Sequence, residues 1–286
     1  MNRWITGARP RTLPAAVVPV AVGAAAAVGE PDAIVWWRVA AALVVSLMLQ
    51  VGVNYANDYS DGVRGTDDVR VGPTRLVASG LASPSAVKRA AMLSFGVAAV
   101  AGLAIALSTS LVLLLVGAAA IAAGWFYTGG PKPYGYLGLG EVFVFVFFGL
   151  VATAGTTYAA IETITALSLV IGSAVGALAC ALLVINNLRD IPTDREVGKK
   201  TLAVRLGDRR TRWFYVSLIS AAFVLSAVGA LWRVPVLLGL VAMPLAIRPV
   251  RSVLGGATGG ALIPVLGETG RLQLAWGLLV TIGLAL

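Results

Sequence analysis

Long apolar stretches that are almost free of charge recur along the whole chain, and they constrain its fold more than any other feature. Of its 286 residues, 58% are hydrophobic and only 12% are charged. A soluble protein of this size carries about twice that charged fraction. The chain is therefore expected to be an integral membrane protein.

The lengths of these stretches predict the fold class. A bilayer core is crossed by about 20 apolar residues in a helix, and the alternating pattern of a β-barrel is absent. The sequence predicts an all-α membrane protein with one domain over residues 1–286, built as a bundle of nine transmembrane helices. The expected segments are about 13–29, 36–57, 87–108, 110–127, 139–160, 165–187, 213–231, 234–250 and 270–286.

The basic residues predict how this bundle lies in the membrane. Nine spans place the N-terminus and the loops after the second, fourth, sixth and eighth segments on one side. Every Lys and Arg except Arg38 and Arg233 lies at or near that side. The positive-inside rule then makes the N-terminus and these loops cytoplasmic and puts the C-terminus outside. The net charge of +9 reflects this topology and the chemistry of a site, so nucleic-acid binding is not expected.

The scarcity of histidine and cysteine excludes several chemistries. The chain has no histidine and a single cysteine, Cys180. This excludes His-dependent triads, His-bound zinc, internal disulfides and CxxC motifs. Cys180 lies in an apolar run and is expected to be a buried packing residue. What remains is chemistry with carboxylates, amides, Arg, Lys, Tyr and a metal ion.

Two acidic stretches interrupt the apolar pattern in the same way, each at the end of a long apolar segment. The first is NYANDYSDGVRGTDD, starting at Asn54, and the second is NNLRDIPTDREVGKKT, starting at Asn186. In a helix, the first stretch places polar side chains at positions i, i+4 and i+7, which share one face. The second stretch places them at every fourth residue, which also keeps them on one face. The aligned residues are Asn54, Asp58 and Asp61 in the first row and Asn186, Asp190 and Asp194 in the second.

Paired acidic rows beside hydrocarbon predict a metal-diphosphate site. Neighbouring carboxylates repel one another, and charge is costly near the bilayer core, whereas a hard divalent cation removes both penalties. Mg²⁺ is commonly held by carboxylates together with substrate phosphates. Solvated loop charges would explain one Asp but not two matched rows. Basic residues suited to phosphate oxygens are interleaved or follow: Arg64, Arg70, Arg75, Arg189, Arg195, Lys199 and Lys200.

A diphosphate at the mouth of an apolar bundle indicates a lipid diphosphate as substrate. Its loss from an allylic carbon leaves a carbocation, which is stabilised by a dry pocket with aromatic faces. Candidate faces are Trp125, Phe126, Tyr127, Tyr134 and Tyr136, with Tyr55 and Tyr59 flanking the first row. Each of them also fits an interfacial aromatic cluster.

At this point the motifs resemble those of the UbiA superfamily of intramembrane prenyltransferases. That family carries NDxxDxxxD after its second helix and DxxxD after its sixth, on a nine-helix bundle. Here the motifs are Asn57-Asp58-x-x-Asp61 and Asp190-x-x-x-Asp194. The resemblance covers nearly the whole chain and implies cytoplasmic loops that cap the site. One position departs from the family, because Gly65 stands where the last Asp of the first row is expected. Asp67 or Asp68 would replace that ligand, and Asp67 is favoured.

Four stretches resemble the branch of the family that prenylates 1,4-dihydroxy-2-naphthoate in menaquinone biosynthesis. They are NDYSDGVRGTD, ARPRTLPAAVVPV, YTGGPKPYGYLGLGE and GRLQLAWGLL. The resemblance implies a Mg²⁺-dependent aromatic prenyltransferase in the cytoplasmic membrane of a prokaryote. Its substrates would be a polyprenyl diphosphate and the naphthoate, and its products demethylmenaquinone or the quinol, CO₂ and diphosphate.

The resemblance also implies roles for individual residues. The expected metal ligands are Asp58, Asp61, Asp67, Asp190 and Asp194. The expected contacts to the diphosphate are Asn54, Asn57, Arg64, Arg75, Asn187, Lys199 and Lys200. Tyr127 would steer the cation, and Lys132 would engage the acceptor carboxylate. Glu141 and Arg9 would lie near the acceptor, although Arg9 also fits a simple cytoplasmic anchor.

The sequence leaves two alternatives to prenylation of the naphthoate. The acidic rows would contact only the prenyl donor, so they do not identify the acceptor. Another acceptor used in the UbiA family, such as 4-hydroxybenzoate, therefore remains an alternative. A transporter is disfavoured, because the segment centres lack Asp, Glu, Lys and Arg. The isoprenoid tail needs an apolar tunnel open to lipid. Gly149, Gly172 and Gly176 permit such a tunnel but favour close helix packing. The sequence does not predict the tail length, the metal count, the base or the oligomeric state.

Overall fold

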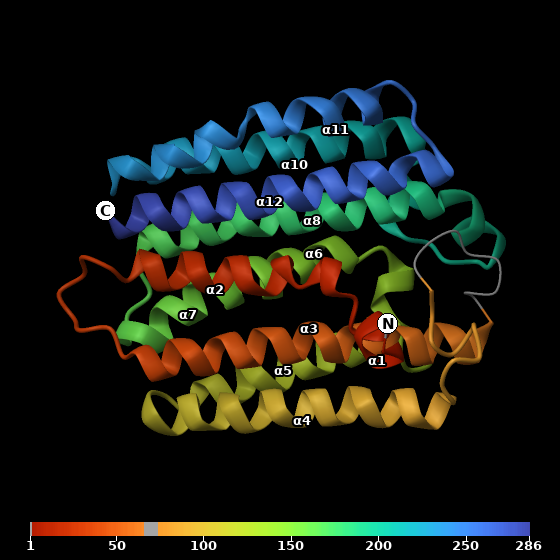
Figure 1. Cartoon of the computed structure of the whole chain (residues 1–286), viewed down its shortest axis with the longest axis horizontal. Helices are drawn as coiled ribbons and strands as arrows, with labels where there is room; N and C mark the ends of the chain where they lie inside the picture. Colours follow the sequence, from red (N-terminus) through yellow and green to blue (C-terminus); the bar gives the residue numbers. More distant parts are fainter. Residues whose placement is uncertain (1, 66–73) are drawn as a thin grey trace.

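The computed structural model describes residues 2–65 and 74–286, and within these ranges its regular elements are all helical. Its helices run roughly along the long axis of the molecule (Figure 1). The elements are α1 (Arg3–Ala8), η1 (Pro10–Thr12), α2 (Pro14–Ala26), α3 (Trp36–Arg64), α4 (Pro84–Ser108), α5 (Val112–Phe126), η2 (Tyr134–Leu137), α6 (Gly140–Val144), the π-helix η3 (Phe145–Val151), α7 (Ala152–Ile161), α8 (Ala166–Glu196), α9 (Leu202–Leu206), α10 (Asp208–Gly229), η4 (Val234–Ala242), α11 (Pro244–Leu254), η5 (Gly259–Ala261) and α12 (Leu262–Ala285).

Each predicted apolar segment lies on one helix or on one interrupted run of helix. The segment 139–160 corresponds to the run α6–η3–α7, and 234–250 corresponds to η4 and α11, which are bent by 47°. Among the described residues, five helices are long and apolar enough to cross a bilayer, or six if the bent pair forms one span. The helices α2 and α5 are shorter, with 13 and 15 residues.

The predicted boundaries were most in error at three helices, which continue where the apolar pattern stops. α3 extends from the predicted end at 57 to Arg64, α8 extends from 187 to Glu196, and α12 begins at Leu262 instead of 270. Both acidic rows therefore lie on helix. Polar side chains are accommodated there because they face other parts of the protein. Gly65 ends α3 in the left-handed conformation, with φ of 69°, which a residue without a Cβ adopts at little cost.

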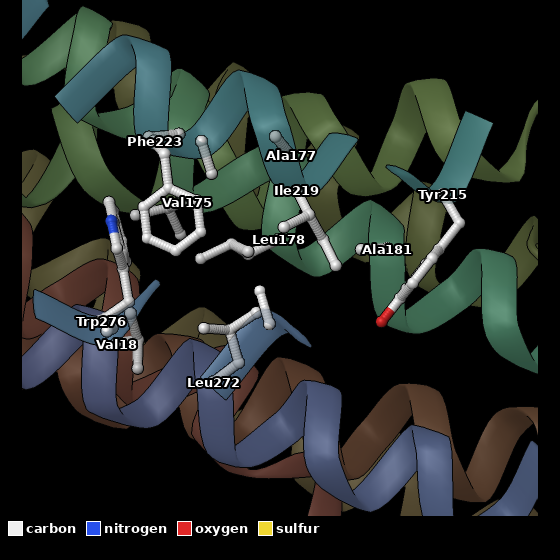
Figure 2. Packing of buried hydrophobic residues seen from close by; sticks show 14 of the residues in the cluster. Val18, Val175, Ala177, Leu178, Ala181, Tyr215, Ile219, Phe223, Leu272 and Trp276 are labelled. Atoms are coloured by element: carbon white, nitrogen blue, oxygen red, sulfur yellow. The ribbon is translucent and has the colours of Figure 1, made fainter. Parts of the chain in front are cut away.

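The core of one half of the molecule is formed by α2, α8, α10 and α12. Apolar side chains such as Val18, Leu178 and Phe223 meet between these helices (Figure 2). Polar contacts also cross this core: Nε1 of Trp276 donates to Ser226 at 3.0 Å. In a membrane helix bundle, close packing and such cross-helix hydrogen bonds hold the helices together.

Close glycine contacts join η3 to α8. A Cβ built on Gly149 would lie 2.5 Å from Cα of Gly176 and 2.8 Å from the carbonyl oxygen of Gly172. The two backbones therefore touch, so these glycines serve helix packing, as favoured from the sequence, and do not form a tunnel wall. This contact fixes the run α6–η3–α7 against α8, and the opposite face of that run is turned toward α3 and α5.

The layers place the two acidic rows at the same end of the molecule. In Figure 1 the order runs from α10 and α11 through α8 and α12, then α2 with α6 and α7, to α3 and α5, with α4 outermost. α1 and the C-terminal ends of α3 and α8 lie at one end, and the C-terminus of the chain lies at the other. The polar ends of α3 and α8 can therefore contribute to one site.

Candidate functional site

A lysine lies between the two acidic rows. Nζ of Lys199 is 3.7 Å from Oδ1 of Asp61 on α3, and it also interacts electrostatically with Asp194 on α8. The hydroxyl of Tyr136 donates a hydrogen bond of 2.7 Å to the same oxygen of Asp61. The structure thus brings Asp61 and Asp194 to one cation, although they are far apart in the sequence.

Lys199 keeps its positive charge at this position. Burial acts to lower the pKa of Lys199, but the negative charges of Asp61 and Asp194 and the contact with Tyr136 outweigh it, so the pKa is raised. Its Nζ also lies 4.6 Å from the ring centre of Tyr136. A protonated amine therefore faces both rows, where it can act as a point charge toward phosphate oxygens.

Asp58 is fully buried and holds the chain that follows the first row. Its Oδ2 accepts the backbone N–H of Leu76 at 2.8 Å, and its Oδ1 accepts that of Val77 at 3.0 Å. Each oxygen keeps a second lone pair. The predicted metal ligand thus also organises the backbone beside the site.

Asn57 and Arg64 connect α3 to the loop after α5. Oδ1 of Asn57 accepts a hydrogen bond of 2.8 Å from the hydroxyl of Thr128. The guanidinium of Arg64 donates to the carbonyl oxygens of Thr128 and Gly130 and lies 5.5 Å from the ring centre of Tyr136. Both residues lie at the site, and here they position the loop that carries the aromatic residues.

Asn54 is bonded to the N-terminal segment. Its Nδ2 donates to the carbonyl oxygen of Ala8 at 2.9 Å and to Thr12 at 3.0 Å. Nη2 of Arg9 donates to the backbone oxygen of Asn54 at 3.4 Å, and Arg9 has a left-handed backbone with φ of 52°. Asn54 and Arg9 therefore hold α1 and η1 against α3.

The second row is organised by contacts within α8 and with α6. Arg189 binds Asp190 through two hydrogen bonds of 2.6 and 2.8 Å, and both residues are buried. Nδ2 of Asn187 donates to Oε1 of Glu141 at 2.9 Å. The contact with Glu141 joins α8 to the start of the run α6–η3–α7.

The remaining predicted residues are spread around this centre. Arg75 is buried, whereas Lys132 and Lys200 are exposed. The backbone N–H of Lys200 donates to the backbone oxygen of Tyr136 at 3.0 Å. Asp67 and Asp68 lie outside the described residues. Within residues 2–65 and 74–286, no three acidic, His or Cys side chains form a ready-made metal-binding group.

An apolar cavity of about 210 Å³ extends along the bundle beside the site. Its wall comes from α2, α3, α4, α5 and the run α6–η3–α7. Tyr127, Tyr134 and Phe143 line one end, and Gly117 and Gly155 lie along it, where an added Cβ would meet nothing within 4 Å. The cavity is thus wide at these glycines and aromatic at one end.

The aromatic end is a continuous set of ring contacts. Tyr127 contacts Tyr134 edge-on at 5.5 Å, Tyr134 stacks on Phe143 at 4.0 Å, and Phe143 stacks on Phe147 at 6.1 Å. In a π-helix a turn takes more residues than in an α-helix, so positions four and five apart share a face. Accordingly Phe147 and Phe148 both line the cavity.

The sequence identified only part of this aromatic surface. Tyr127 and Tyr134 line the cavity, whereas Tyr136 contacts Asp61 and Lys199 instead. Trp125 does not line it and stacks with Tyr59 at 6.1 Å. Phe143, Phe147 and Phe148 were missed. Phe143 and Phe147 share a face in an α-helix as well, whereas Phe148 joins them only because of the π-helical run. The run FVFVFF was the available signal.

Comparison with known proteins gives a consistent result. The model of the UbiA prenyltransferase family matches residues 16–254. The chain is 53% identical to the 1,4-dihydroxy-2-naphthoate octaprenyltransferase of Mycobacterium tuberculosis, over 99% of this chain and 97% of that protein. It is 35% identical to the enzyme of that name from Escherichia coli, over 99% and 95%.

Solved structures with little sequence identity share the fold. The apo structure of a UbiA homologue from Aeropyrum pernix superposes with a TM-score of 0.73 at 15% identity, covering 94% of this chain and 97% of that one. A UbiA homologue from Archaeoglobus fulgidus, bound to DMAPP and Mg²⁺, gives 0.63 at 17% identity, covering 98% and 100%.

Proposed function

Because the chain belongs to the UbiA prenyltransferase family, we propose that it transfers a polyprenyl chain to 1,4-dihydroxy-2-naphthoate in menaquinone biosynthesis. The donor is a polyprenyl diphosphate, and the other products are diphosphate and CO₂. The observation that carries this proposal is an apolar, aromatic-ended cavity beside two acidic helix ends, in a chain 53% identical to an enzyme named for this acceptor.

The diphosphate is placed between the ends of α3 and α8. Lys199 supplies positive charge there, and Asn57, Arg64, Arg75, Asn187 and Lys200 are the further candidate contacts. Divalent metal use is supported by the Mg²⁺-bound and Cd²⁺-bound homologues. In this chain Asp61 and Asp194 already share a cationic partner in Lys199, which fits a site where positive charge is held between the rows.

The proposed metal ligands are Asp58, Asp61, Asp67, Asp190 and Asp194. The bound metal supplies charge neutralisation for the diphosphate as it leaves. Lys199 adds a fixed charge at the same place, so the developing negative charge is stabilised by groups that need no rearrangement. The buried surroundings of Asp61 limit water and strengthen these interactions.

The allylic end of the donor lies at the aromatic end of the cavity. There the faces of Tyr127, Tyr134 and Phe143 stabilise the cation that forms as the C–O bond breaks. The tail occupies the apolar cavity and leaves sideways toward lipid. Lys132, exposed in the loop beside this end, and Arg9 are candidate partners for the carboxylate of the incoming naphthoate.

The arrangement in the membrane follows from the same proposal. The nine apolar segments cross the cytoplasmic membrane of a prokaryote, with the shorter helices α2 and α5 among them. The N-terminus and the ends of α3 and α8 face the cytoplasm, where the loops around Lys199 cap the site, and the C-terminus lies outside. The basic residues at that end support this orientation.

The proposal is tested with the purified protein in lipid, given a polyprenyl diphosphate, Mg²⁺ and either 1,4-dihydroxy-2-naphthoate or 4-hydroxybenzoate. We expect prenylated naphthoate only, sensitive to EDTA and lost in Asp61→Ala and Asp190→Ala. If only 4-hydroxybenzoate is prenylated, the reaction type is retained, but the acceptor is that of another branch of the family. No product with either acceptor would overturn the proposed reaction.

A further inference from the structure

Glu141 holds a carboxylate oxygen that has no partner within residues 2–65 and 74–286. The residue is 5% exposed, and Asn187 donates to its Oε1 at 2.9 Å. Its Oε2 is buried and has no hydrogen-bond partner among the described residues. A buried carboxylate oxygen without a donor is strongly unfavourable. The fold nevertheless holds this residue in place, because the thiol of Cys180 donates to its backbone oxygen at 3.1 Å.

Glu141 lies between the aromatic end of the cavity and the second acidic row. A Cβ added to the preceding Gly140 would lie 3.5 Å from the hydroxyl oxygen of Tyr127. Tyr127 lines the cavity and interacts electrostatically with Glu141. Asn187, which donates to Glu141, lies about one helical turn before Asp190 on α8, so Glu141 is also linked to the second acidic row. Glu141 itself lies just behind the cavity wall at Tyr127, so a flat molecule bound beside Tyr127 reaches its carboxylate when Oε2 turns toward the cavity.

The contacts that the described part of the chain makes to Glu141 include no positively charged group. The groups that face it are Asn187 and Cys180 from α8 and Tyr127 from the end of α5. Among the described ion pairs none includes Glu141. A bound molecule with a hydroxyl group would supply the missing donor, since an ionised carboxylate oxygen only accepts.

The proposed acceptor carries two hydroxyl groups on its ring. Removing the proton from one of them makes the ring a stronger nucleophile toward a carbocation. We propose that Oε2 of Glu141 takes this hydroxyl proton while Asn187 holds the carboxylate in position; this inference rests on the proposed function. General bases placed in this way contribute about 10²–10⁴-fold to a rate.

The proton and the electrons balance through the reaction. The C–O bond to the diphosphate breaks, a C–C bond forms at the ring carbon that bears the carboxylate, and the hydroxyl proton passes to Glu141, leaving a ring ketone. Loss of CO₂ returns the electron pair of its bond to the ring. The ring oxygen then takes the proton back from Glu141, so no proton is consumed.

The test compares Glu141→Gln, Glu141→Asp and the exposed neighbour control Val142→Ala in the purified full-length protein. Product formation from the naphthoate is measured as kcat and as a pH profile, and donor affinity is measured with a non-reacting diphosphate analogue. We expect kcat of the glutamine variant to fall by about 100-fold or more, with donor affinity retained. The aspartate variant should recover part of the rate, and the control should match the wild type.

The outcomes separate this inference from the proposed function. If the wild type binds the donor but makes no prenylated naphthoate, the proposed function falls, and the role of Glu141 falls with it. If the wild type is active and the glutamine variant keeps a kcat within about threefold, Glu141 is not the base. Loss of donor binding in the glutamine variant would also overturn the inference, because a base for the acceptor takes no part in holding the donor.

Discussion

Nζ of Lys199, in the segment after α8, lies 3.7 Å from Oδ1 of Asp61 on α3. This ion pair joins the two helices that carry the acidic rows, and the side chains are only 12% and 6% exposed. The pair sets the electrostatic character of the site, since one partly buried ammonium faces carboxylates from both rows.

Removing this ammonium should weaken donor binding. We expect Lys199→Met to raise the KM for the polyprenyl diphosphate by about 10- to 100-fold, because a charge-assisted contact contributes about 1.5–3 kcal/mol. Steady-state kinetics over a range of donor concentrations measure this effect. Lys88→Met is the control, since Lys88 lies over Tyr59 and Trp125, which do not line the cavity. An unchanged KM in Lys199→Met would contradict the placement of the diphosphate.

The raised pKa of Lys199 gives a stability with a defined pH dependence. Burial acts against protonation, but Asp61 and Asp194 outweigh it, so the folded protein binds this proton more tightly than the unfolded chain. The stabilisation is therefore fully present below about pH 10 and is lost as the pH rises through the raised pKa. Thermal unfolding of wild type and Lys199→Met should differ by a constant amount between about pH 6 and pH 9. A difference that vanished within this range would show that Lys199 titrates there.

Asp58 and Asp61 should behave differently when their charge is removed. Asp58→Asn loses charge-assisted hydrogen bonds to the backbone of Leu76 and Val77, so we expect lower thermal stability by about 1.5–3 kcal/mol as well as lost activity. Asp61→Asn should lose activity with a smaller change in stability. Unfolding in detergent and product assays on both variants give the comparison. Equal stability losses would show that the backbone contacts of Asp58 have no special role.

The ring of Tyr127, and not its hydroxyl, should matter for the allylic cation. Tyr127→Phe is expected to keep most of kcat, whereas Tyr127→Leu should lose about 10- to 30-fold, since a desolvated cation–π contact contributes about 2 kcal/mol. Single-turnover product formation measures this without interference from product release. Equal losses in both variants would instead point to the hydroxyl.

Filling the cavity should shorten the tail that the protein accepts. Gly155 lies on the cavity wall with open space around it, so Gly155→Leu places a side chain where the tail lies. We expect kcat/KM for long donors to fall by about 10- to 100-fold, as for overpacking of 1–3 kcal/mol, while a dimethylallyl donor is little affected. Gly96→Leu is the matched control, because Gly96 also has open space but is exposed outside the cavity. A uniform loss across donor lengths would place the tail elsewhere.

The sequence was informative where one helix carries the whole signal. Apolar runs located the long helices, and the spacing of Asp58 from Asp61 and of Asp190 from Asp194 put each row on one helix. The ends of these helices were predicted too short, since apolarity stops at the rows while the helices continue to Arg64 and Glu196. Hydrophobicity reports contact with lipid, whereas a helix end is decided by capping groups such as Gly65.

By itself the sequence determined the membrane character, the all-helical class, the family and the residue types of the site. These depend on composition and on the local helical period, which the order of residues specifies directly. Only the tertiary structure decided that Lys199 lies between the rows and that Asp58 binds backbone amides. It alone also shows that Oε2 of Glu141 has no donor among the residues that the structure describes. It also decided that the π-helix turns neighbouring phenylalanines toward one cavity. These features are either contacts between segments distant in the chain or a local change of helical pitch. Both kinds of feature arise from tertiary packing, which a local sequence pattern does not predict.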